Sequence, residues 1–395
     1  MPEESHASSS LPKDFIEPVA RGAENDKPVP SEVSPESSLD ELLIFARHQG
    51  ASDIHVSAER PLLIRRFGVL EPRTEAMFPQ SAVERIVKEA LDEEDMRDFH
   101  KQGDLELVYC VDGHGRFRVT LMKQRRGWDF TARVIPTRVR PFEESGLPPA
   151  CLELIKWPQG LILVTGPAGC GKTATLSTLV ETINQTRNDH IILIEDPIEV
   201  LFEPKECQIT QRQIHRHTLS QANALRAALR EDPDILVISE LRDLQSIQIA
   251  VTAAETGHLV LGSMNTNNAA QTISTLIDSF PPEEQSIITN MISESLRGVI
   301  SQQLLPRADG SGMIPAYELL VVTPAVANMI RERKIQAMNN AMTTGKAAGM
   351  VLLDNSLLGL VQQGLVSVQE AACRAVNPMT FAQYTPGEGG GYGKN

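Results

Sequence analysis

One segment has the residue types and the spacing needed to hold a chain of phosphates. Residues 166–173 read GPAGCGKT and fit the pattern G-x-x-x-x-G-K-[ST]. Glycines let the backbone N–H groups of such a loop turn inward around phosphate oxygens, the lysine neutralises the β- and γ-phosphates, and the hydroxyl of Thr173 can ligate Mg²⁺. We therefore predict a site for ATP and Mg²⁺. Its nucleotide-binding residues are expected to be Gly166, Pro167, Ala168, Gly169, Cys170, Gly171, Lys172, Thr173 and Ala174.

Three further polar residues next to apolar runs are candidates for chemistry on the nucleotide. Glu195 follows HIILI, and its carboxylate could order Mg²⁺ or the attacking water; a solvated acidic turn is the other interpretation. Glu240 follows DILVIS at a Walker B position, where it would polarise water or hold a metal-bound water. His258 opens HLVLG and could sense the γ-phosphate, or could be an ordinary polar residue at a strand start. We predict that all three converge on the nucleotide.

The elements around these residues predict an α/β domain. From residue 151 on, short apolar strands alternate with helices, which is typical of a mostly parallel sheet covered on both faces. Ligands of such folds bind at the carboxyl edge of the sheet. A helical region is expected from about Glu283 to Asn377.

A smaller α+β domain is predicted before it, over residues 38–137. Ser38 is a plausible N-cap for a first helix that ends at Gly50, and residues 81–103 are expected to form one helix among several strands. Residues 1–37 are rich in Ser, Pro and Glu, which predicts a disordered leader. The remaining expected segments are a linker at 138–150, an ATPase domain at 151–378 and a flexible tail at 379–395.

Composition excludes some classes of function. The formal net charge is -14, which argues against a protein that tracks nucleic acid over its whole surface. The five cysteines are scattered, so they predict neither a disulfide framework nor a CxxC zinc pair, and they favour a reducing, cytosolic location. No secretory signal or apolar stretch of about 20 residues is present in the sequence, so membrane contact is expected only through a partner.

Residues 38–378 resemble the type II/IV secretion ATPases, and most closely the PilT-type ATPases of type IV pilus retraction and twitching motility. The resemblance rests on motifs in the family's order. These are ASDIH at 51–55, GRFRV at 115–119, the phosphate loop, ILIEDPIEV at 192–200 (the aspartate box), residues 217–243, and TAAETGHLVLGSMNT at 252–266 (the histidine box).

The resemblance implies a PAS-like N-terminal domain, a RecA-like P-loop NTPase domain, and a homohexameric ring with ATP between subunits. It makes Glu195 and Glu240 the carboxylates of the acidic box and Walker B, and His258 the first histidine of its box. Arginines of the first domain are expected to reach the phosphates: Arg116 as a binding residue, Arg118 and Arg133 as catalytic ones. It also implies a bacterial cytoplasmic location beside the inner membrane, a pilus platform protein there as partner, and possibly a paralogous pilus ATPase; no nucleic acid and no direct membrane insertion are expected.

Retraction is favoured over assembly because the four-cysteine zinc element usual in assembly and type II secretion ATPases is missing: residues 262–395 contain only Cys373. Residues 323–367 resemble the retraction family's C-terminal helices, with Ala327 to Glu332 where that family has a motif needed for retraction. Two positions depart from the family, since Asn265 replaces the second histidine and Ser239 replaces a glycine. The alternatives are a secretion or DNA-uptake motor, a weakly hydrolysing accessory paralogue, a non-hydrolysing regulator and, disfavoured by acidity, a nucleic-acid motor.

Overall fold

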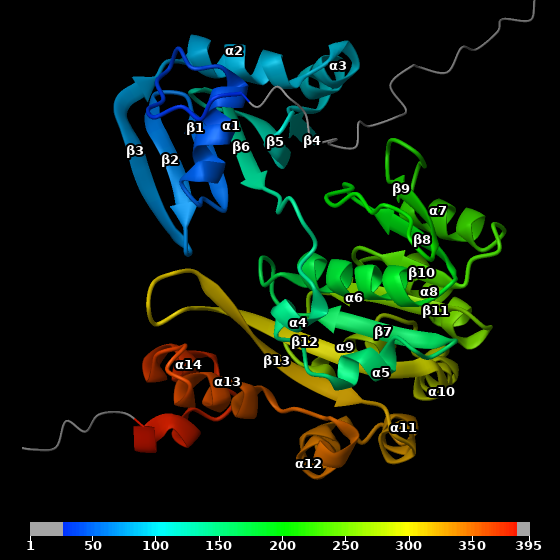
Figure 1. The fold of residues 1–395 in the computed structure, drawn as a ribbon. Coiled ribbons are helices and arrows are strands. Elements are labelled where there is room, and N and C mark those ends of the chain that lie inside the picture. Colours follow the sequence, from blue (N-terminus) through cyan, green and yellow to red (C-terminus); the bar gives the residue numbers. More distant parts are fainter. Residues whose placement is uncertain (1–26, 385–395) are drawn as a thin grey trace, which may run out of the picture. The chain divides into compact units, whose positions relative to one another are not determined.

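The computed structural model describes residues 27–384, so predictions about residues 1–26 and 385–395 lie outside it (Figure 1). The chain divides into two compact units. The first comprises the residues up to Arg66 together with Leu70–Thr137, and the second comprises Phe67–Val69 together with the residues from Arg138 on. Each unit has its own hydrophobic core, and each is described by itself.

The first unit is built on a six-stranded sheet in the order β3-β2-β1-β6-β5-β4. Side chains alternate along β5, so that Phe117, Val119 and Leu121 are buried in the core while the residues between them lie on the other face. The strands are β1 (Asp53–Ser57), β2 (Arg60–Arg66), β3 (Val69–Phe78), β4 (Asp104–Val111), β5 (Gly115–Gln124) and β6 (Gly127–Val134).

Three helices share the core of this sheet: α1 (Leu39–His48), α2 (Gln80–Ala90) and α3 (Glu93–Gln102). Ser38 caps α1 as predicted and forms a reciprocal capping box with Glu41. The single helix predicted for residues 81–103 is wrong. Asp92 breaks it, because its carboxylate accepts hydrogen bonds from the backbone N–H groups of Glu94 and Asp95 and so begins a new helix.

The chain is already packed on this unit from Lys27, so the predicted disordered leader does not extend to residue 37. The Arg85 guanidinium donates to the carbonyls of Pro35 and Ser37, both at 2.8 Å, and Lys27 forms an ion pair with Asp40. Val33 packs against the core.

The second unit contains a seven-stranded sheet in the order β13-β12-β7-β11-β10-β8-β9. All neighbours are parallel except β12 and β13. The strands are β7 (Gly160–Thr165), β8 (His190–Glu195), β9 (Gln208–Gln213), β10 (Ile235–Ile238), β11 (Leu259–Met264), β12 (Leu296–Pro306) and β13 (Met313–Val321).

The strands β12 and β13 correct the prediction that residues 283–377 are helical. β12 pairs in parallel with β7 and antiparallel with β13 over nine residue pairs, so its apolar side chains are buried in the sheet. A short apolar run does not by itself distinguish a buried strand from a buried helix, which explains the error. The helices that remain in this region are α10 (Gln285–Ser295), α11 (Pro324–Arg331), α12 (Met338–Thr344), α13 (Leu353–Gln362) and α14 (Val368–Arg374).

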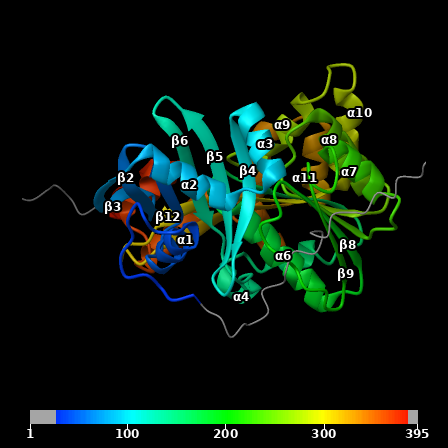
Figure 2. The same cartoon turned by 90° about the horizontal axis from the view of Figure 1, so that it is seen from above.

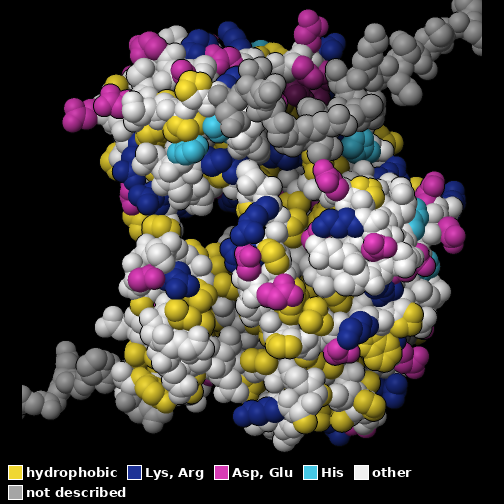
Figure 3. Space-filling view, in the orientation of Figure 1, with side chains coloured by type: hydrophobic (Ala, Val, Ile, Leu, Met, Phe, Trp, Pro, Cys, Tyr) yellow, Lys and Arg dark blue, Asp and Glu magenta, His cyan; other side chains and the backbone are white. Residues whose placement is uncertain are grey.

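Helices cover both faces of the sheet, as predicted for an α/β domain. Figures 1 and 2 place α6 (Lys172–Thr186) on one side of the strands and α8 (Leu244–Glu255) on the other. Two separate apolar clusters fill the two interfaces. The other helices along the sheet are α7 (Gln221–Ala228) and α9 (Ala269–Asp278). On the face seen in Figure 3, acidic and basic side chains of this unit are interspersed.

The predicted linker and part of the predicted flexible tail are packed on this unit. Residues 138–150 include α4 (Phe142–Ser145), bury Leu147, and begin α5 (Ala150–Leu154). The 3-10 helix Pro378–Tyr384 buries Phe381 fully, so the predicted flexible tail does not begin at residue 379.

Two general features concern the whole described chain. Cys110 and Cys373 are exposed, whereas Cys151, Cys170 and Cys207 are buried. Among residues 27–384, no helix combines the length and the apolar character needed to cross a bilayer.

Candidate nucleotide-binding site

The phosphate loop joins the end of β7 to the start of α6. Its glycines adopt backbone angles that L side chains rarely take, with φ of 146° at Gly166, 77° at Gly169 and 96° at Gly171. Gly166 is also required by space, because a Cβ atom there would lie 2.3 Å from the carbonyl oxygen of Gln302. The loop conformation therefore favours glycine at these three positions, at Gly166 for its backbone angle and for the close approach of Gln302.

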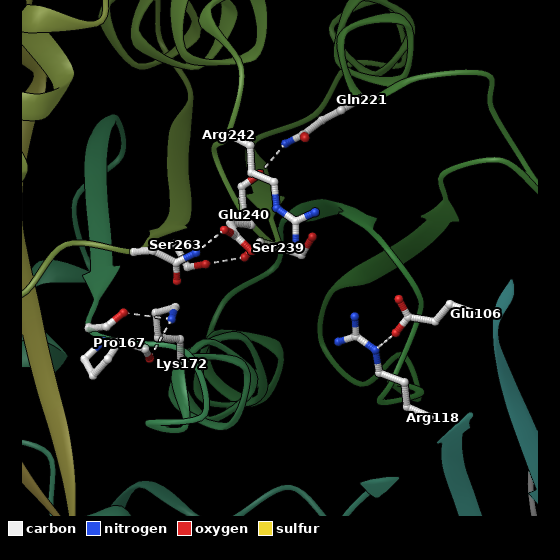
Figure 4. Close-up of polar contacts among 11 residues, drawn as sticks. Glu106, Arg118, Pro167, Lys172, Gln221, Ser239, Glu240, Arg242 and Ser263 are labelled. Carbon is white, nitrogen blue, oxygen red and sulfur yellow. Dashed lines mark hydrogen bonds and ion pairs between the residues drawn. The ribbon is translucent and has the colours of Figure 1, made fainter. Parts of the chain in front are cut away.

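The loop and the first turn of α6 present the groups that a polyphosphate needs. Lys172 is the first residue of α6, and its ammonium donates to the carbonyls of Gly166 at 2.9 Å and Pro167 at 3.1 Å (Figure 4). Gly171, the N-cap, provides no side chain to occupy the first N–H groups of the helix. These N–H groups, the helix dipole and the lysine fit an anion, and the exposed hydroxyl of Thr173 fits a magnesium ligand.

Glu240 lies in the loop after β10 and is held by several groups. Its carboxylate accepts from the Arg242 guanidinium at 2.8 Å and from the side-chain amide of Asn265, which follows β11. Its backbone carbonyl accepts from the Gln221 side chain at 2.9 Å, and Ser263 donates to the neighbouring carbonyl of Ser239 (Figure 4). The carboxylate is therefore positioned from two strands at once.

Glu195 ends β8 and is only 8% exposed. Its carboxylate accepts from the side chain of Gln211 at 2.9 Å, and the same Gln211 amide donates to the carbonyl of Val200 at 2.8 Å. The parallel register pairs Ile194 with Ile238. Glu195 and the Glu240 loop consequently leave the sheet at the same edge.

The phosphate loop leaves at this edge too, since Thr165 is the register partner of Met264. The structure thus places the ends of β7, β8, β10 and β11 at one edge of the sheet. That the loop, Glu195 and Glu240 converge on a nucleotide stays a prediction.

The prediction that His258 joins this cluster is wrong for the residues of a single subunit. His258 precedes Leu259, which pairs with Gly160 at the amino end of β7, so it lies at the opposite edge of the sheet. Six strand residues at about 3.3 Å each put it about 20 Å from the phosphate loop. Its ring is hydrogen-bonded to the carbonyl of Ala253, near the end of α8, at 3.1 Å. The residue that takes the expected place near Glu240 is Asn265, at the carboxyl end of the same strand.

The three candidate arginines belong to the first unit. Arg118 on β5 and Arg133 on β6 are cross-strand partners, and Arg116 lies two residues before Arg118 on the same face of β5. Arg118 forms an ion pair with Glu106, also drawn in Figure 4, and Arg133 donates to the Asp53 carboxylate at 2.9 Å. Their role toward a nucleotide stays a prediction.

Sequence reasoning missed Gln302, which touches the loop from β12. Its side-chain amide donates to the carbonyl of Cys170 at 2.7 Å, and its side-chain oxygen accepts from the hydroxyl of Thr175 at 2.7 Å. A signal was available: the polar triplet SQQ interrupts the apolar run of residues 296–306, and a buried polar residue needs partners.

A mostly parallel sheet with a phosphate loop after one strand and carboxylates after two others defines a RecA-like P-loop nucleotide-binding fold. The family model described as "Type II/IV secretion system protein" matches residues 31–369. The chain belongs to this family.

Relatives with known names extend the comparison. A Pseudomonas aeruginosa protein named "Type IV pilus retractation ATPase PilT" is 42% identical over 343 residues, covering 87% of this chain and 99% of that protein. A Neisseria gonorrhoeae "Twitching motility protein" is 41% identical over 303 residues, covering 76% and 81% of the two chains. The solved structure titled "Crystal Structure of the Pilus Retraction Motor PilT and Bound ADP" has a TM-score of 0.77 at 37% identity, covering 88% of this chain and 100% of that chain.

Proposed function

We propose that this protein is a motor ATPase that hydrolyses ATP to drive retraction of a type IV pilus. The observation that carries the proposal is the shared sheet edge, at which the glycine-rich phosphate loop with Lys172 and the hydrogen-bonded carboxylates of Glu195 and Glu240 all follow the ends of parallel strands. The direction of the work is supported by the relative named for pilus retraction, which aligns over nearly its whole length.

In this proposal each site residue has a separate task. The loop N–H groups and Lys172 bind the β- and γ-phosphates. To do so, the Lys172 ammonium gives up its hydrogen bonds to the carbonyls of Gly166 and Pro167 and binds phosphate oxygens instead. The hydroxyl of Thr173 would hold Mg²⁺, which, when bound, neutralises charge on the phosphates. Glu240 orients the attacking water and takes its proton, and Glu195 supports the water or the metal from the neighbouring strand.

The assembly is proposed to be a ring of identical subunits, as in the family resemblance. Arg116, Arg118 and Arg133 would then reach the phosphates, with Arg118 and Arg133 first leaving Glu106 and Asp53. The force would pass to a platform protein in the inner membrane.

Turnover of purified protein tests the site. We expect Lys172→Ala to abolish nucleotide binding, because the substitution removes both the positive charge and the long side chain that brings it to the phosphates. Glu240→Gln should retain binding but lower kcat by about 10² to 10⁴, the usual contribution of a general base. ATP hydrolysis at the wild-type rate in both variants would reject the assigned site. In the source organism, the Lys172→Ala allele should leave surface fibres that no longer shorten.

A weakly hydrolysing accessory ATPase is a second candidate, favoured by the surroundings of Glu240. The carboxylate is hydrogen-bonded to Arg242 and Asn265, so it would have to leave these partners to engage an attacking water. Steady-state phosphate release separates the two: a motor turns over ATP continuously, whereas the accessory protein would bind ATP and release little phosphate.

A further inference from the structure

The strand β12 touches the phosphate loop at both of its ends. At the start of the loop, the hydroxyl of Thr165 donates to the hydroxyl of Ser301 at 2.8 Å, and the backbone carbonyl of Gln302 fills the space beside Gly166. At the other end, the Gln302 side chain bonds to Cys170 and to Thr175. Two consecutive residues of one strand, Ser301 and Gln302, therefore contact the chain at the start of the loop, at Cys170 within it, and in the first turn of α6.

The bond to Cys170 determines where a loop N–H group points. A trans peptide is planar, so the carbonyl of Cys170 and the N–H of Gly171 point in opposite directions. Because the Gln302 amide binds that carbonyl at 2.7 Å on the β12 side, the N–H of Gly171 is directed away from Gln302. The second bond fixes the first turn of α6 through Thr175.

The Gln302 side chain is itself held in this orientation. It is 2% exposed, and its cross-strand partner on β13 is the buried Tyr317, whose hydroxyl donates to the carbonyl of Ser145 at 3.1 Å. A side chain locked by packing and hydrogen bonds can impose a direction on the loop.

We propose that Gln302 is a positioning residue for phosphate binding: through Cys170 and Thr175 it presets the N–H groups that receive the phosphates. The inference rests on the proposed function, since it concerns the same nucleotide site. It predicts that nucleotide affinity depends on Gln302 beyond any contribution of Gln302 to stability.

The test compares Gln302→Met with Gln303→Met in the full chain. Methionine matches glutamine in length but makes neither hydrogen bond, and Gln303 is the next residue on β12, where it contacts neither Cys170 nor Thr175 in the described structure. We expect the Kd for ADP to rise about ten- to a hundredfold in Gln302→Met and to stay within about twofold in Gln303→Met. The KM for ATP should rise similarly, while kcat at saturating ATP changes less.

Thr175→Val supplies a second, nearly isosteric variant that removes only the hydroxyl donor. It should raise the Kd by a smaller factor, and adding it to Gln302→Met should cause little further loss, because both changes act on the same contact. If Gln302→Met does not fold, Thr175→Val decides the matter.

The outcomes separate the two proposals. Wild-type protein that fails to bind ADP contradicts the proposed function, and this inference with it. This inference alone is overturned if the wild type binds ADP and a folded Gln302→Met variant binds it with the same Kd as Gln303→Met. If Gln302→Met does not fold, the same comparison is made with Thr175→Val.

Discussion

Asn265 holds the Glu240 carboxylate through a group that does not titrate. The family resemblance puts a histidine at this position, and an imidazole changes its charge near pH 6.5. The amide of Asn265 instead donates the same hydrogen bond at every physiological pH. The position of Glu240 should therefore not depend on protonation of its neighbour.

Asn265→His should make turnover depend on pH more strongly than it does in the wild type. As the pH falls from 8 to 6, the new imidazole gains a proton and pairs with Glu240, so the carboxylate is less available to an attacking water. The ratio of variant to wild-type kcat should fall about three- to tenfold across this range. Asn267→His, two residues further along the same loop, is the control. A ratio that stays constant with pH would contradict the assigned contact.

At the residue scale, the sequence predicted the groups whose type and spacing encode their chemistry. The phosphate loop, Glu195 and the Glu240 loop share one edge of the sheet because parallel strands end there. His258 was misplaced because it begins a strand instead of ending one. Gln302 was not predictable as a loop contact, because its partners are more than 120 residues away in sequence.

At the element scale, a hydrogen bond links strand β13 to helix α9, which follows the loop that contains Asn265. Glu318 on β13 is 4% exposed and accepts from the backbone N–H of Ala269, the first residue of α9, at 2.8 Å. Burial raises the pKa of this carboxyl above its ordinary value, and the nearby negative charge of Asp354 raises it further. The native state thus retains a proton on Glu318 at pH values where the unfolded chain has lost it.

This raised pKa predicts how stability changes with pH. A group that binds its proton more tightly in the native state makes the protein less stable as the pH rises above about 4.5. Glu318→Gln keeps the acceptor without the charge, so its Tm relative to the wild type should increase between pH 5 and pH 8. Glu318→Ala should cost about 1–3 kcal/mol at pH 5, because the Ala269 N–H loses its acceptor, and less at pH 8, because the substitution also removes the buried charge. A Tm difference for Glu318→Gln that does not vary with pH would refute this account.

At the element scale, the helices that begin with a clear capping pattern, and the strands adjacent to those helices in sequence, were predictable. The capping box at Ser38 and Glu41 is a local pattern, and it is present. The second cap at Asp92 was overlooked inside a long helical pattern. The hairpin of β12 and β13 could not be derived from local pattern, since its burial depends on pairing with β7, more than 130 residues earlier.

At the scale of the whole molecule, each unit contains one tryptophan that can report on it. Trp128 lies on β6 of the first unit, and Trp157 precedes β7 in the second, where the Arg297 guanidinium stacks on its ring. The two-unit division itself was predictable from composition and element order; the packing of residues 27–37 and 379–384 was not, because it depends on distant partners such as Arg85.

ADP should stabilise the unit that contains the phosphate loop. Binding at a hundredfold excess over Kd contributes about 2.7 kcal/mol to the unit that binds. In Trp128→Phe protein, the Trp157 fluorescence transition should therefore shift upward by roughly 5–10 °C. In Trp157→Phe protein, the Trp128 transition should shift less. Lys172→Ala removes the shift; an ADP effect that survives this substitution would place the ligand elsewhere.

The distribution of thiols offers a way to label both units of the intact protein. Cys110 on β4 and Cys373 on α14 are exposed, one on each unit. Burial raises the pKa of Cys151 to about 12, and it also raises the pKa values of Cys170 and Cys207, so these three are poor nucleophiles. Maleimide dyes would accordingly attach at two native positions, one on each unit, without any engineered cysteine.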